Sequence, residues 1–156
     1  MFLKLTRFLF ILSVLIVSGC SSLTSRGAYT VTRLTTEDAD KAARLITAYR
    51  ASKGLGPLTV DEKLNKAAMV QAQNVAKTGE LEHGNFQGRL VDAGITLTAA
   101  ENLAARTGSV ERAIEEWKTS PGHNRNMLKP EVTRMGLARA DSNAKYKDFW
   151  VLVVGH

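Results

Sequence analysis

The C-terminal part of the chain contains an unbroken apolar run, Phe-Trp-Val-Leu-Val-Val, at residues 149–154. A strand without polar alternation is typical of a sheet that is covered on both faces, because side chains on either face are then buried. Residues 134–140 precede this run, with Met135 and Leu137 alternating around Gly136, and the turn-rich residues 141–147 connect the two stretches. The pair predicts an antiparallel β-hairpin.

Several other stretches show the apolar spacing of amphipathic helices. Helices are predicted over residues 35–54, 61–79, 87–93 and 109–118, with Thr35 and Asp38 in capping-box spacing, Ser109 as an N-cap and Gly79 as a stop. Residues 95–105 are expected to be extended or irregular, with Glu101 and Asn102 at a turn. Helices around a small sheet indicate an α+β layered domain.

The first twenty residues have the layout of a secretory signal. Lys4 and Arg7 precede an apolar run at residues 8–17, and small residues then lead to Cys20, the single cysteine of the chain. This layout resembles the lipobox of bacterial lipoproteins, which implies cleavage before Cys20 and acylation of that residue. The alternative is an ordinary signal peptide that leaves an unused thiol.

These features predict a signal peptide at residues 1–19, a tether at 20–34 and one folded domain at 35–156. Without a second cysteine the domain forms no internal disulfide, so a hydrophobic core must hold it together. Removal of residues 1–19 lowers the formal charge from +6 to +4. The remaining positive charge is dispersed, and no nucleic-acid-binding motif is present, so we expect no nucleic-acid partner.

One stretch places a histidine just after a predicted helix end: Trp117-Lys-Thr-Ser120-Pro-Gly-His123-Asn-Arg-Asn126-Met-Leu128. Pro121 cannot continue a hydrogen-bonded helix, so the chain is expected to turn there. His83 also follows a predicted helix end, whereas His156 is the last residue. Together with Glu101, His83 and His123 could bind a divalent metal or form a metal-free polar cleft.

The blocks His83-Gly, Ala-Glu101-Asn-Leu-Ala, Trp117 to Leu128, Met135-Gly-Leu and Phe149-Trp resemble, in order and spacing, the CAP superfamily. This superfamily includes cysteine-rich secretory proteins, insect venom antigens and plant pathogenesis-related proteins, and the chain is most similar to the bacterial secreted branch. The resemblance implies a three-layer α-β-α sandwich with a small, mainly antiparallel sheet. It also implies a cleft where His83, Glu101 and His123 meet, with Asn126 beside them, and in which some members bind zinc or another divalent cation.

The chain departs from the family pattern at two places in that cleft. Ser120 stands where eukaryotic members carry a second cleft glutamate, and Leu152 stands where a glutamine is common. The departures weaken the case for a shared reaction.

Three functions fit the sequence. The favoured one is a lipid-anchored binding module of the bacterial cell envelope, whose cleft takes a cation, a lipid or another small envelope ligand. The second is a zinc-assisted hydrolase with Glu101 as a ligand or general base; the chain has no His-Glu-x-x-His motif, and Ser120 is expected to cap a turn rather than act as a nucleophile. The third is a purely structural polar cluster.

Overall fold

The computed structural model describes residues 28–96 and 98–156. Its elements are β1 (Val31–Thr35), α1 (Ala39–Ala51), β2 (Thr59–Val60), α2 (Glu62–Thr78), α3 (Phe86–Asp92), β3 (Ala99–Ala105), α4 (Val110–Thr119), α5 (Pro121–Met127), β4 (Arg134–Ser142) and β5 (Asp148–Gly155). Within these residues no helix is long and apolar enough to cross a membrane. The predicted signal segment and Cys20 lie outside the described residues.

The strands form one sheet in the order β1-β4-β5-β3, and the short β2 pairs with the start of β4. β4 and β5 are antiparallel from the Arg134–Gly155 pair to the Asp141–Asp148 pair, which confirms the predicted hairpin. β1 and β3 are also antiparallel to their neighbours, and only β2 is parallel to β4.

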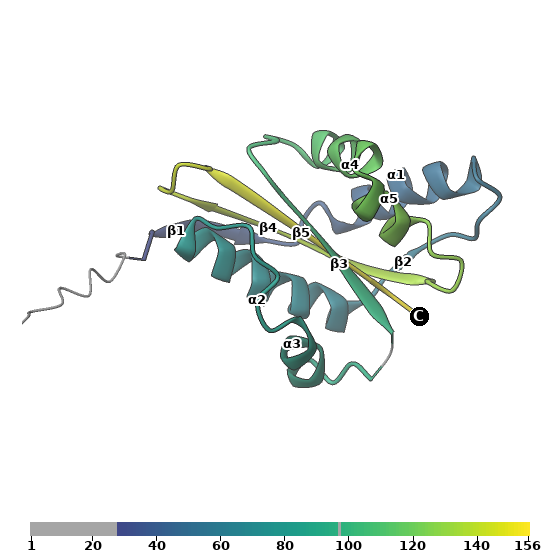
Figure 1. Ribbon diagram of the computed structural model, residues 1–156, viewed down its shortest axis with the longest axis horizontal. Coiled ribbons are helices and arrows are strands. Elements are labelled where there is room, and N and C mark those ends of the chain that lie inside the picture. The colour runs from purple at the N-terminus through teal and green to yellow at the C-terminus, as the bar shows by residue number, and fades with distance from the viewer. Residues whose placement is uncertain (1–27, 97) are drawn as a thin grey trace, which may run out of the picture.

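The apolar run in β5 is buried on both faces, as its sequence predicts. Trp150, Leu152 and Val154 belong to a core beneath α1, α4 and α5. The alternate residues Phe149, Val151 and Val153 belong to a second core, beneath α2 and α3. Figure 1 shows the two helical layers on opposite sides of the sheet, which is the α-β-α sandwich expected for an α+β chain. Full burial of one such side chain stabilises the fold by about 1.5–3 kcal/mol.

The contact between α2 and β4 requires a glycine. A Cβ added to Gly136 would lie 2.1 Å from the main-chain carbon of Leu64 in the first turn of α2. At the same place the side-chain oxygen of Asn65 accepts the N–H of Leu137 at 3.0 Å. Leu137 lies in the part of β4 between the residues that pair with β2 and those that pair with β1. The bond from Asn65 therefore satisfies a main-chain N–H of β4 that has no strand beside it.

Four local predictions are corrected by the structure. The predicted tether includes a strand, because β1 pairs with β4. The first helix begins at Ala39 rather than at residue 35, and Asp38 makes no side-chain capping bond. Glu101 and Asn102 lie inside the regular strand β3 rather than at a turn, because pairing with β5 outweighs the weak strand preference of their sequence. His123 lies in the short helix α5, which starts at Pro121.

We expect Gly136→Ala to destabilise the protein strongly. The added Cβ meets backbone atoms of α2, which cannot rotate away, so α2 must shift from the sheet. The free energy of unfolding should fall by about 3 kcal/mol or more. Chemical denaturation monitored by tryptophan fluorescence measures the change.

The matched control is Gly56→Ala, because a Cβ at Gly56 has nothing within 4 Å. Its free energy of unfolding should stay within about 0.5 kcal/mol of wild type. Equal stabilities of the two variants would contradict the close approach of α2 to β4.

Candidate functional site

His83 lies in the loop between α2 and α3, and its ring contacts a buried carboxylate. Its Nδ1 is 2.9 Å from Oε1 of Glu101 in β3. The side chain of His83 is 56% exposed, whereas that of Glu101 is 1% exposed. The side-chain amide of Gln71 in α2 donates to the carbonyl oxygen of Glu82, which fixes the loop just before His83. With its proton on Nδ1, His83 donates to Glu101 and keeps Nε2 free.

The main partner of Glu101 is Arg89 in α3, a residue that the sequence analysis did not identify. Arg89 Nη2 lies 2.9 and 2.7 Å from the two carboxylate oxygens. Its Nη1 donates to the main-chain oxygen of His83 at 2.8 Å, and its side chain is 8% exposed. From the sequence, Glu101 either points to water or has a partner, because an unpaired buried carboxylate is costly. Sequence spacing alone does not identify that partner.

On the opposite face of β3, Asn102 connects the strand to α5. Its side-chain nitrogen donates to the main-chain oxygen of His123 at 3.0 Å. Asn126 donates to the side-chain oxygen of Asn102 at 2.9 Å and lies 3.3 Å from the main-chain oxygen of Glu101. These bonds hold α5, and with it His123, against β3.

His123 is partly buried, and its Nδ1 is buried without a hydrogen-bond partner. Burial lowers the pKa of His123, and positive charge on His83 lowers it further, whereas Glu116 acts in the opposite direction. His123 is therefore neutral at neutral pH.

The structure places the His83 ring against the Glu101 carboxylate, and it places Asn126 and the main chain of His123 against the other face of β3. His156 lies elsewhere. Arg134 binds the main-chain oxygen of His156 at the end of the sheet. Ser120 occupies the N-cap position of α5 but makes no side-chain capping bond. Leu152 is a core residue beneath α4 and α5.

Chemically, the site offers the imidazole of His83, which is held by the Arg89–Glu101 ion pair. A carboxylate on the far nitrogen of a histidine sets the tautomer and the ring orientation, as in many metal and ligand sites. Both carboxylate oxygens of Glu101 are engaged by Arg89. Among the described residues, no group of three His, Cys, Asp or Glu side chains is arranged to hold a metal ion.

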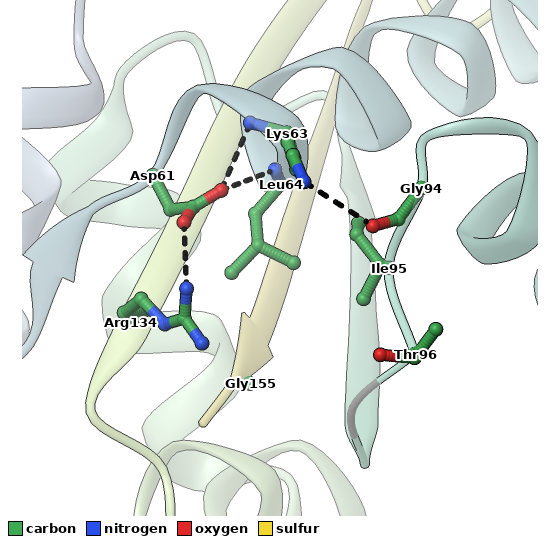
Figure 2. Close-up of a pocket in the computed structure, with 8 residues that line it drawn as sticks. All are labelled: Asp61, Lys63, Leu64, Gly94, Ile95, Thr96, Arg134 and Gly155. Atoms are coloured by element: carbon green, nitrogen blue, oxygen red, sulfur yellow. Dashed lines mark hydrogen bonds and ion pairs between the residues drawn. The ribbon is translucent and has the colours of Figure 1, made fainter.

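A separate hollow of about 230 Å³ lies at the start of α2 and was not foreseen from the sequence (Figure 2). Asp61 caps the helix there: its carboxylate accepts the N–H groups of Lys63 and Leu64 and lies 3.1 Å from Arg134. Burial alone would raise the pKa of Asp61, but these bonds outweigh it and lower the pKa. The Asp61 carboxylate is thus ionised and serves as the N-terminal cap of α2.

The chain is an α-β-α domain with a histidine–carboxylate pair, His83 and Glu101, at the edge of its sheet. The model of the cysteine-rich secretory protein family, CAP, matches residues 43–154. The chain therefore belongs to the CAP family.

Three comparisons show how far the similarity extends. The chain is 31% identical over 110 residues to the uncharacterized protein YkwD of Bacillus subtilis strain 168, covering 67% of this chain and 43% of YkwD. It thus spans less than half the length of that relative. An outer surface protein of Borrelia burgdorferi shares the fold with a TM-score of 0.68 at 22% identity, over 83% of this chain and 97% of that protein. The structure of NaASP2 with Zn²⁺ shares it with a TM-score of 0.55 at 16% identity, over 78% of this chain and 80% of that one.

We expect Arg89→Met to destabilise the protein, because it leaves the buried carboxylate of Glu101 without its counter-charge. Breaking a buried ion pair from one side costs about 3–5 kcal/mol. The double variant Arg89→Met/Glu101→Gln removes both charges and should recover part of this loss. Denaturant unfolding of the three proteins measures the effect.

The control is Arg112→Met, which truncates an exposed arginine on α4. Its free energy of unfolding should change by no more than about 0.5 kcal/mol. The ion pair has no stabilising role if Arg89→Met costs no more than this control.

Proposed function

We propose that this CAP domain is a lipid-anchored binding module of the bacterial cell envelope, and that the cleft between His83 and His123 takes its ligand. The observation that carries the proposal is the Arg89–Glu101–His83 series of contacts, which fixes the orientation of His83 and leaves its Nε2 free. His123 contributes a neutral imidazole from the opposite layer. A structural cluster alone would not need an accessible nitrogen on the exposed His83 ring.

A divalent cation is the first ligand class to test. Neutral imidazole nitrogens are good ligands for Zn²⁺, and the contact of His83 Nδ1 with Glu101 leaves Nε2 of that ring for the ion. In this proposal Glu101 orients the His83 ring through Nδ1 and does not bind the cation directly, because Arg89 already binds both oxygens of Glu101. When bound, the cation would polarise a ligand oxygen, and water would complete its coordination. The structure of NaASP2 with Zn²⁺ makes zinc the first ion to try.

We expect the wild-type protein to bind one Zn²⁺ in a calorimetric titration, and His83→Ala and His123→Ala each to abolish measurable binding. Glu101→Gln should weaken binding by about 10- to 100-fold, as loss of an outer partner of a ligating histidine does. His156→Ala is the matched control and should bind like wild type, because His156 lies outside the cluster.

Absence of zinc binding in the wild-type protein would contradict the cation site. If His123→Ala then also lowers the stability, the cluster is structural. If the stability is unchanged, the cleft remains a candidate for a metal-free ligand.

The proposed lipid anchor is inferred from the sequence around Cys20. The apolar run at residues 8–17 and the small residues before Cys20 fit a lipoprotein signal, and two or more acyl chains suffice for stable attachment to a membrane. The Borrelia burgdorferi protein that shares the fold is an outer surface protein. Together these support a location on the outer side of a bacterial membrane.

We expect Cys20→Ala to move the protein from the membrane fraction to the soluble or unprocessed pool in fractionated bacterial cells, because it removes the acylation site. Immunoblotting of the fractions and the mass of the mature protein check this. Ser21→Ala is the control and should stay with the membrane. Continued membrane association of processed Cys20→Ala would contradict the anchor.

A further inference from the structure

The described chain begins at one end of the sandwich, where three segments meet. The N–H of Tyr29 donates to the main-chain oxygen of Lys77 near the end of α2. Thr30 exchanges two hydrogen bonds with Asn143 in the β4–β5 turn. The Tyr29 ring also packs beside Gly79, which Ala144 approaches as well. Figure 1 shows the start of the coloured chain, the β4–β5 turn and one end of α2 gathered at the left of the molecule.

This end carries exposed cations interleaved with tyrosines. The guanidinium of Arg106 lies 5.5 Å from the centre of the Tyr146 ring, and Nζ of Lys145 lies 5.8 Å from it. Arg106 holds a left-handed backbone (φ 66°) at the end of β3, and its N–H donates to the main-chain oxygen of Asp148. We call the set the basic–aromatic face: Tyr29, Lys77, Arg106, Lys145, Tyr146 and Lys147.

Acidic groups at this end do not cancel the positive charge. Glu80 is exposed beside Gly79, and Asp148 follows Lys147. Asp148 is already engaged, since its carboxylate accepts the N–H groups of Thr107 and Gly108 and the indole N–H of Trp150. Asp141, opposite Asp148 in the hairpin, is paired with Arg139. The four cations of the face against Glu80 and Asp148 then leave a formal charge of +2 around the two tyrosines.

We propose that the basic–aromatic face docks on the anionic phospholipid surface of the membrane that holds the lipid anchor. The inference rests on the proposed acylation of Cys20 and assigns the domain an orientation. Residues 20–27 separate the anchor from the described chain and span at most about 28 Å when fully extended. The face that surrounds this point is therefore held near the lipid headgroups.

The chemistry of the face fits that partner. Lysine and arginine near an anionic leaflet gain about 1 kcal/mol each, which corresponds to about fivefold in binding per residue. Tyrosine suits the headgroup region, because its ring is apolar and its hydroxyl is polar.

Docking on this face would keep the cleft accessible. Glu101 pairs with Val153, whereas the β4–β5 turn ends at Asp148. At about 3.4 Å per residue, Val153 lies about 17 Å along β5 from that turn. The cleft would therefore stand clear of the headgroups and face a ligand in the envelope space.

The test uses the mature chain from residue 20 with Cys20→Ser, so that no acyl chain contributes. We expect it to cosediment with mixed phosphatidylglycerol–phosphatidylcholine vesicles at low salt and not with pure phosphatidylcholine vesicles. Lys145→Gln/Lys147→Gln should weaken binding by about 25-fold, from about fivefold per cation. Raising the ionic strength should also release the wild-type protein.

The matched control is Arg44→Gln/Lys53→Gln, which removes the same charge from exposed positions on and after α1, away from the β4–β5 turn. It should bind within about threefold of wild type, since only long-range attraction changes. Equal weakening of the two variants, or equal binding to both kinds of vesicle, would overturn the proposal. Because this assay needs no acylation, its outcome is independent of the Cys20→Ala fractionation.

Discussion

Burial of β5 on both faces is the constraint on which the rest of the fold depends. Trp150, Leu152 and Val154 require one helical layer, and the alternate residues require the other, so the sheet must be the middle layer. β3, the next strand, inherits the same alternation at the edge of the sheet. Glu101 points towards α3 and contacts the ring of His83. The next residue, Asn102, points towards α5 and donates to the main-chain oxygen of His123. The contacts to both histidine segments thus come from one strand at the edge of the sheet.

The outer edge of β3, which has no neighbouring strand, is covered by side chains and cannot pair with an added strand. The main-chain oxygen of Leu103 accepts the indole N–H of Trp117 at 3.0 Å, and that of Glu101 lies 3.3 Å from the side chain of Asn126. Side chains of α4 and α5 therefore occupy positions that an incoming strand would need. This arrangement favours a ligand that is recognised by side chains over an extended peptide that pairs with the sheet.

Two buried arginines hold the loops around the cleft by different means. Arg89 neutralises a carboxylate, so its removal leaves a buried charge. Arg50, at the end of α1, is 1% exposed and donates to the carbonyl oxygens of Gly56, Met127, Lys129 and Val132. It ties α1 to the segment after α5 by hydrogen bonds to main-chain groups that would otherwise be unsatisfied. Tyr49 adds a bond from α1 to Asn124, next to His123. The position of His123 thus depends on both α1 and β3.

The parts of the fold that the sequence predicts are those with a strong local period. The β4–β5 hairpin, α2 and α4 follow from alternation or helical spacing, and their caps at Asp61 and Ser109 follow from local hydrogen bonding. β3 could not be predicted in this way, because Ala-Ala-Glu-Asn-Leu-Ala-Ala has little intrinsic strand preference and is a strand only beside β5. A cleft with His83, Glu101 and His123 stays a prediction from the family resemblance, and Arg89 was not predicted. A carboxylate in an apolar segment either points to water or is partnered, and the choice of Arg89 as partner depends on how α3 packs over β3. Long-range packing, which leaves no period in the sequence, therefore determines the chemistry of this site.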